Sequence, residues 1–117
     1  MAEMRDTRKI SWIKAALRDF EKFPSDVQGD MLDALTVAAE GGKSEKAKPF
    51  HCVDGGVFEI ALRYRGDAFR ALYAVKIDAD IWVIHAFQKK SKSGIGTPRM
   101  EVEPIRDRLK RLKEALK

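Results

Sequence analysis

Residues 57–88 read VFEIALRYRGDAFRALYAVKIDADIWVIHAFQ. Residues 57–65 alternate with the two-residue period of a half-buried strand: the apolar set is Phe58, Ile60, Leu62 and Tyr64, and the polar set is Glu59, Arg63 and Arg65. Gly66-Asp67 predicts a turn, residues 68–77 a returning strand, and residues 78–80 a second turn before an apolar strand at 81–88. Three consecutive strands with short links predict an antiparallel meander.

The segment before this meander has the pattern of a short strand and two helices. Ile10 and Trp12 alternate with polar neighbours, which indicates an opening strand. Apolar residues then recur at helical spacing up to Phe23-Pro24, and a second helical stripe runs to Gly41-Gly42. Ser25, with Gln28 three residues later, is typical of a capping box at the start of the second helix. We expect a helical hairpin, followed by a loop over residues 41–48.

The last part of the chain is predicted to be a basic helix. Thr97-Pro98 is typical of a helix start. Because proline disfavours a helix interior, Pro104 predicts a single turn near residues 98–102 and a main helix from 104 onward. The fold class expected is α+β: an N-terminal helical hairpin packed on a small antiparallel sheet of three to four strands, with a basic C-terminal helix. Residues 1–8 are expected to be a flexible arm and residues 9–117 a single domain with its helices on one face of the sheet.

Charge is distributed unevenly along the chain. Of the formal net charge of +5, residues 88–117 contribute +6, with 10 Lys/Arg against 4 Asp/Glu, and the remainder contributes −1. Such a concentration is typical either of a polyanion site or of a solvated basic helix. No apolar run approaches the ~20 residues that span a bilayer, and a lone cysteine, Cys52, favours a reducing cytoplasm. One cysteine and two histidines predict no metal site, and no cofactor is expected.

Four short runs carry a more specific signal: GVFEI at 56–60, FRALY at 69–73, HAFQKKSK at 85–92, and Thr97-Pro98 before the basic helix. With the order of elements, they resemble the RelE/ParE toxin superfamily, most closely its HigB-like, phage-associated branch, over about residues 9–115. The resemblance implies a cytoplasmic toxin of a type II toxin–antitoxin system. Its implied activity is metal-independent, ribosome-dependent cleavage of mRNA, and its implied partner is a cognate helix-turn-helix antitoxin, through which alone it would contact operator DNA.

The resemblance also implies site residues. It places an active-site arginine at Arg70, whose alternative role is that of an edge-strand arginine paired with Glu59. Lys89 and Lys90 end the third strand and are assigned to catalysis, against an alternative role in solubility and edge protection. Glu59 is a candidate general base, or it orients Arg63. The further RNA-binding assignments are Arg63, Lys92 and Arg99.

His85 has a pKa suited to acid–base chemistry, but strand alternation groups it with Ile81, Val83 and Phe87. It is therefore expected to be a hydrogen-bonded core histidine, and no later His or Tyr offers a general acid. On the face of the sheet opposite to His85, an apolar patch around Leu72 is expected, covered by the C-terminal helix or by an antitoxin segment. Two other functions stay open, a ParE-like inhibitor of gyrase that has no catalytic activity and an inactive phage-derived binding module.

Overall fold

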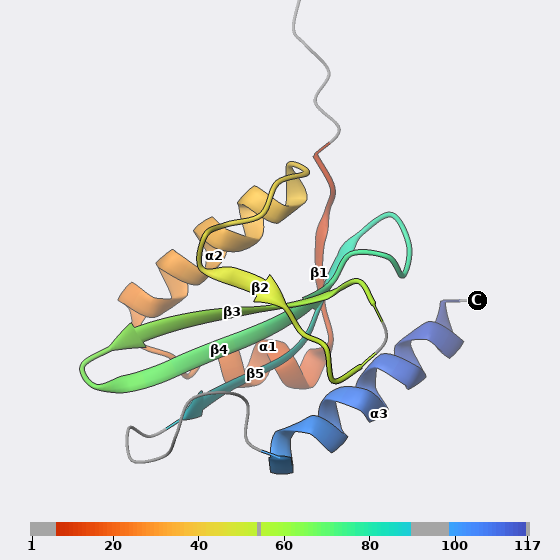
Figure 1. The fold of residues 1–117 in the computed structure, drawn as a ribbon. Coiled ribbons are helices and arrows are strands. Elements are labelled where there is room, and N and C mark those ends of the chain that lie inside the picture. The colour runs from red at the N-terminus through yellow and green to blue at the C-terminus, as the bar shows by residue number, and fades with distance from the viewer. Residues whose placement is uncertain (1–6, 54, 90–98, 117) are drawn as a thin grey trace, which may run out of the picture.

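A computed structural model describes residues 7–53, 55–89 and 99–116, with the side chain of Arg99 left out. Its elements are β1 (Ile10–Trp12), α1 (Lys14–Phe20), α2 (Ser25–Ala39), β2 (Ala47–Pro49), β3 (Val57–Tyr64), β4 (Asp67–Ala74), β5 (Ile81–Lys89) and α3 (Arg99–Ala115). Within the described residues the strands form one five-stranded sheet, ordered β1-β5-β4-β3-β2 (Figure 1). The α+β class and the meander are therefore confirmed.

The sheet is larger than predicted, and it is mixed. β1 runs parallel to β5, whereas the other neighbouring strands are antiparallel. The additional strand is β2, whose first two residues belong to the segment 41–48 that was predicted to be a loop because it is small and charged. It forms an edge of the sheet through the pairing of Ala47 with Ile60 and Pro49 with Phe58. Proline is tolerated there because an edge strand leaves part of its backbone without a ladder partner.

The hairpin between β3 and β4 closes one residue earlier than predicted. Tyr64 pairs with Asp67, so the turn consists of Arg65 and Gly66, which have φ angles of 52° and 87°. Two consecutive positive φ angles match the right-handed twist of a two-residue hairpin. This turn fixes the register that brings the polar side chains of β3 and β4 onto one face.

Helices cover both faces of the sheet, not one as expected (Figure 1). α1 packs on β5 and α2 mainly on β3, and these helices share one core with Ile60, Phe69 and Tyr73. α3 packs on the opposite face, in a second core. That second core contains Leu72, Ala74, Ile84, Ile105, Leu109 and Leu112. The apolar patch around Leu72 is therefore covered by the C-terminal helix, the first of the two predicted alternatives.

A bulge in β5 changes which side chains face α3. Leu72 pairs with His85 and Tyr73 with Val83, so Ile84 is an extra residue on β5. Cross-strand partners share a face, so His85 lies on the Leu72 face, together with Phe87. The predicted alternation is therefore wrong from His85 onward, because one inserted residue reverses the phase of the strand.

The helix termini contain two further corrections. α2 begins at Ser25 with Pro24 as its N-cap and no side-chain cap, so the predicted capping box is wrong. Gln28 does reach back, but its amide donates to the carbonyls of Phe23 and Glu21. α3 continues through Pro104 as one helix. Proline at that position removes only the bond to the carbonyl of residue 100, near the helix start, and the apolar stripe of α3 outweighs that loss.

Arg8, which was expected to belong to the flexible arm, is attached to the domain. Its backbone N–H donates to the carbonyl of Ala39 at 2.8 Å. Its guanidinium donates to the carbonyls of Val75, Asp78, Ala79 and Asp80, which form the β4–β5 turn. In the part of the chain that is described, no helix has the length and apolar character needed to cross a membrane.

Candidate functional site

The predicted site residues that the structure describes gather on the face of the sheet that carries α3. Arg70 on β4 pairs with Ala61 on β3 and with Phe87 on β5. Arg63 and Lys89 both pair with Ala68, one step along the same face. The three strands therefore bring cationic side chains together from positions up to 26 residues apart in the sequence.

Arg70 and Glu59 form a buried ion pair in this cluster. Nη1 of Arg70 lies 3.0 Å from Oε2 of Glu59, and each side chain is only 11% exposed. Nε of Arg70 is buried and has no hydrogen-bond partner among the described residues. A buried donor left unpaired costs about 1–3 kcal/mol, so this edge of the guanidinium is suited to receive an anionic oxygen. β4 lies in the sheet interior, so the alternative of an edge-strand arginine is wrong in its location, although the pair with Glu59 is present.

The other predicted cations differ in exposure. Lys89 is buried at the end of β5, which does not fit the alternative role in solubility. Arg63 is exposed and approaches the carbonyl of Gly66 at 3.5 Å. Lys90 and Lys92 lie outside the described residues. Arg99 begins α3, and its side chain also lies outside the described part.

His85 makes two polar contacts with α3. Its Nε2 lies 2.7 Å from Oε1 of Glu101, and its Nδ1 lies 2.7 Å from Nη1 of Arg108. Arginine can only donate, so Nδ1 accepts and the ring proton resides on Nε2, which donates to Glu101. Burial lowers the pKa of His85, the hydrogen bond with Glu101 opposes this, and the charge of Arg108 adds to the lowering. His85 is thus a hydrogen-bonded buried histidine as predicted, although on the face opposite to the one expected.

Sequence reasoning missed Glu101 and Arg108. Both lie on the same helical stripe as Ile105 and Leu112. Ile105, Arg108 and Leu112 follow Glu101 by four, seven and eleven residues. An amphipathic helix normally reserves such positions for apolar residues. Two charged residues on a buried stripe were therefore the signal that could have identified them.

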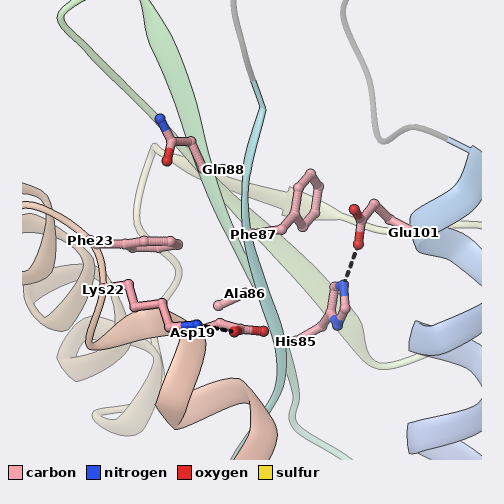
Figure 2. A pocket seen from close by; sticks show the side chains of 8 residues that line it. All are labelled: Asp19, Lys22, Phe23, His85, Ala86, Phe87, Gln88 and Glu101. Atoms are coloured by element: carbon pink, nitrogen blue, oxygen red, sulfur yellow. Dashed lines mark hydrogen bonds and ion pairs between the residues drawn. The ribbon is translucent and has the colours of Figure 1, made fainter.

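A pocket of about 280 Å³ lies where His85 meets α3. Figure 2 shows its lining: Asp19, Lys22 and Phe23 on one side of β5, and His85, Phe87 and Glu101 on the other, with Ala86 and Gln88 between. A larger pocket of about 730 Å³ lies between the loop at His51 and the side of α3 that carries Arg106 and Lys113. Within residues 7–53, 55–89 and 99–116, no three His, Cys, Asp or Glu side chains lie close enough together to hold a metal ion.

Comparison with known proteins identifies the family. Residues 18–110 match the model of the family described as "Phage derived protein Gp49-like". The chain belongs to this family. No curated protein matches the chain.

Two solved structures are similar in fold. The isolated Escherichia coli RelE toxin is 21% identical, with a TM-score of 0.56, and the match covers 90% of this chain and 98% of that one. A chain of the toxin–antitoxin complex RelBE2 from Mycobacterium tuberculosis is 15% identical, with a TM-score of 0.50, and the match covers 78% of this chain and 100% of that one. This Gp49-like protein therefore has the RelE fold, and the predicted resemblance to the RelE/ParE superfamily is confirmed at the level of the fold.

Proposed function

We propose that this Gp49-like protein is the toxin of a type II toxin–antitoxin system, of the HigB-like branch, and that it cleaves mRNA on the ribosome without a metal ion. The RelE fold and the family support the toxin assignment. The observation that carries the cleavage activity is the buried Arg70, whose Nη1 is held by Glu59 and whose Nε has no described partner.

The chemistry follows from what RNA cleavage requires. When the 2′-oxygen of a ribose attacks the adjacent phosphorus, negative charge grows on the phosphate oxygens. The planar guanidinium of Arg70 is fixed on one side by Glu59 and can donate from its other edge to such an oxygen. Lys89 lies on the same face and supplies a second positive charge. We assign Arg63, Lys90, Lys92 and Arg99 to contacts with the RNA strand.

Induced expression followed by primer extension on cellular messages tests this function. New internal 5′ ends are expected with the wild type and with Arg111→Ala, a control whose side chain is 78% exposed. Arg70→Ala is expected to abolish them. Arg70→Lys retains the charge but loses the fork geometry, and is expected to reduce them by at least tenfold. Thermal melting of each variant separates loss of chemistry from loss of the fold.

Two outcomes would overturn the cleavage function. Unchanged messages together with accumulated gyrase–DNA breaks would instead support the gyrase inhibitor. Unchanged messages without breaks would support the inactive binding module. We also propose a cognate helix-turn-helix antitoxin as partner, which is checked by whether the neighbouring reading frame encodes one and whether its co-expression restores growth.

A further inference from the structure

α3 carries two charged residues where apolar ones would suffice to hold it on the sheet. Glu101 and Arg108 lie on the stripe of Ile105 and Leu112, which packs in the second core. Apolar residues of similar volume are often as stabilising as a buried ionic group, or more so. The arrangement therefore calls for a use beyond attachment of the helix.

Arg108, His85 and Glu101 form a chain of hydrogen bonds in which each residue donates to the next. Arg108 donates to Nδ1 of His85, also donates to the carbonyl of Ile84 at 3.3 Å, and so fixes the imidazole ring. Nε2–H of His85 then donates to Oε1 of Glu101. Since Nδ1 is occupied by a donor, His85 cannot take a second proton without losing Arg108. The group left to accept a proton is the carboxylate of Glu101, which has further lone pairs and is 25% exposed.

This carboxylate lies beside the cationic cluster. His85 precedes Phe87 by two residues on β5, their rings are 5.6 Å apart, and Phe87 pairs directly with Arg70. Figure 2 shows Glu101 reaching from α3 to His85 beside the ring of Phe87, at the pocket. Arg70 and the Glu101–His85 pair therefore border neighbouring parts of one face, joined by Phe87.

We propose that Glu101 is the proton acceptor of the cleavage reaction, and that His85 and Arg108 are positioning residues that hold its carboxylate. This inference rests on the proposed function. Glu101 takes the proton of the ribose 2′-hydroxyl while the 2′-oxygen bonds to phosphorus. The bond from phosphorus to the 5′-oxygen breaks, and that oxygen takes a proton from water. The hydroxide that remains is neutralised by the proton that Glu101 releases, which returns the carboxylate to its starting state. The products are a 2′,3′-cyclic phosphate and a 5′-hydroxyl.

Other charges face the same pocket and bear on its pH dependence. Asp19 of α1 and Lys22, just after this helix, line it, and Nζ of Lys22 lies 3.9 Å from Oδ1 of Asp19. Arg108 lies on the far side of His85. Asp19, Lys22 and Arg108 stay in place in a Glu101→Gln variant. Loss of the carboxylate removes a contact that opposes the lowering of the pKa of His85, so the wild type and the variant are compared over the whole pH range.

The test is single-turnover cleavage of a 5′-labelled message bound to ribosomes, with the protein in excess, from pH 5 to 9. Glu101→Gln is expected to lower the maximal rate by at least 100-fold, within the range of general base catalysis. Its half-saturating concentration should stay close to that of the wild type. Its melting temperature should fall by at most about 4–8 °C, because a neutral amide oxygen still accepts from His85. Its rate should lose the acidic limb of the pH profile. Glu103→Gln, on the same helix but 79% exposed, is the matched control and should cleave at the wild-type rate.

The positioning role has its own readout. His85→Gln retains an N–H donor for Glu101, whereas His85→Phe removes it, so the glutamine variant should cleave at least tenfold faster than the phenylalanine variant at equal binding. Glu101→Gln cleaving within threefold of the wild type, or losing rate only in proportion to lost binding or stability, would overturn the inference. A wild type that cleaves no message overturns the proposed function itself, whatever the variants do.

Discussion

Replacing Glu59 by Gln separates positioning of Arg70 from direct proton transfer by Glu59. The substitution keeps the shape of the side chain and removes its charge, at a bond of 3.0 Å between side chains that are each 11% exposed. A hydrogen bond to a charged group contributes about 1.5–3 kcal/mol, and a neutral acceptor about half of that. We therefore expect the free energy of unfolding to fall by about 1–2 kcal/mol.

The expected loss in free energy of unfolding is large enough to be measured by the melting temperature. The entropy of unfolding of a domain of this length is about 0.25 kcal/mol/K, so the melting temperature should fall by about 4–8 °C. If all of the lost energy served to position Arg70, cleavage would slow by at most about 5–30-fold. Loss of a general base would instead slow it by about 10²–10⁴-fold.

Calorimetry and single-turnover cleavage on ribosome-bound message measure the two effects side by side. Asp107→Asn, which removes one charge from an exposed pair with Arg111, is the control and should change stability by less than about 1 kcal/mol. A Glu59→Gln protein that melts like the wild type, cleaves more than 100-fold more slowly and loses the acidic limb of the pH profile would refute positioning of Arg70 by Glu59.

Three further predictions concern the scaffold. Ile105→Ala, at a fully buried position between α3 and the sheet, should lower the free energy of unfolding in urea by about 2–5 kcal/mol. Gly56→Ala should lower it by about 1–2 kcal/mol, because φ is +92° and the new Cβ would lie 2.9 Å from Cγ of Lys76. The pKa of His85 is lowered in the folded protein, so the unfolded chain takes up this proton first as the pH falls below about 6.5. The wild type should therefore lose more stability than His85→Gln between pH 7.5 and 5, in chemical denaturation at each pH.

The sequence predicted the elements whose pattern is local. The meander follows from alternation in residues 57–88, and both N-terminal helices from their apolar spacing. β2 could not be predicted, because Ala47–Pro49 becomes a strand only by pairing with β3. Continuation of α3 through Pro104 depends likewise on packing of the helix against the sheet, which a local rule for proline does not contain.

The bulge in β5 decides which candidate residues strand alternation places on the correct face of the sheet. Arg70 lies on β4 and Glu59 on β3, and the bulge on β5 does not change the alternation of these strands. Lys89 follows the bulge on β5, but it was chosen for its charge and for the resemblance, not from alternation. His85 was assigned to the wrong face because the extra residue at Ile84 leaves no local signature in an apolar run. Because the bulge turns His85 toward α3, its hydrogen-bond partners are Glu101 and Arg108 of that helix.

The attachment of Arg8 to the β4–β5 turn has a practical consequence. That turn lies at the opposite end of β4 from the Arg65-Gly66 hairpin, and Arg70 and Lys89 lie toward the hairpin end. A tether or fluorophore joined upstream of Arg8 would thus be held at the far end of the sheet from the cationic cluster. The protein can be immobilised there on a sensor surface with that cluster facing the solution, provided that Arg8 itself is left unchanged.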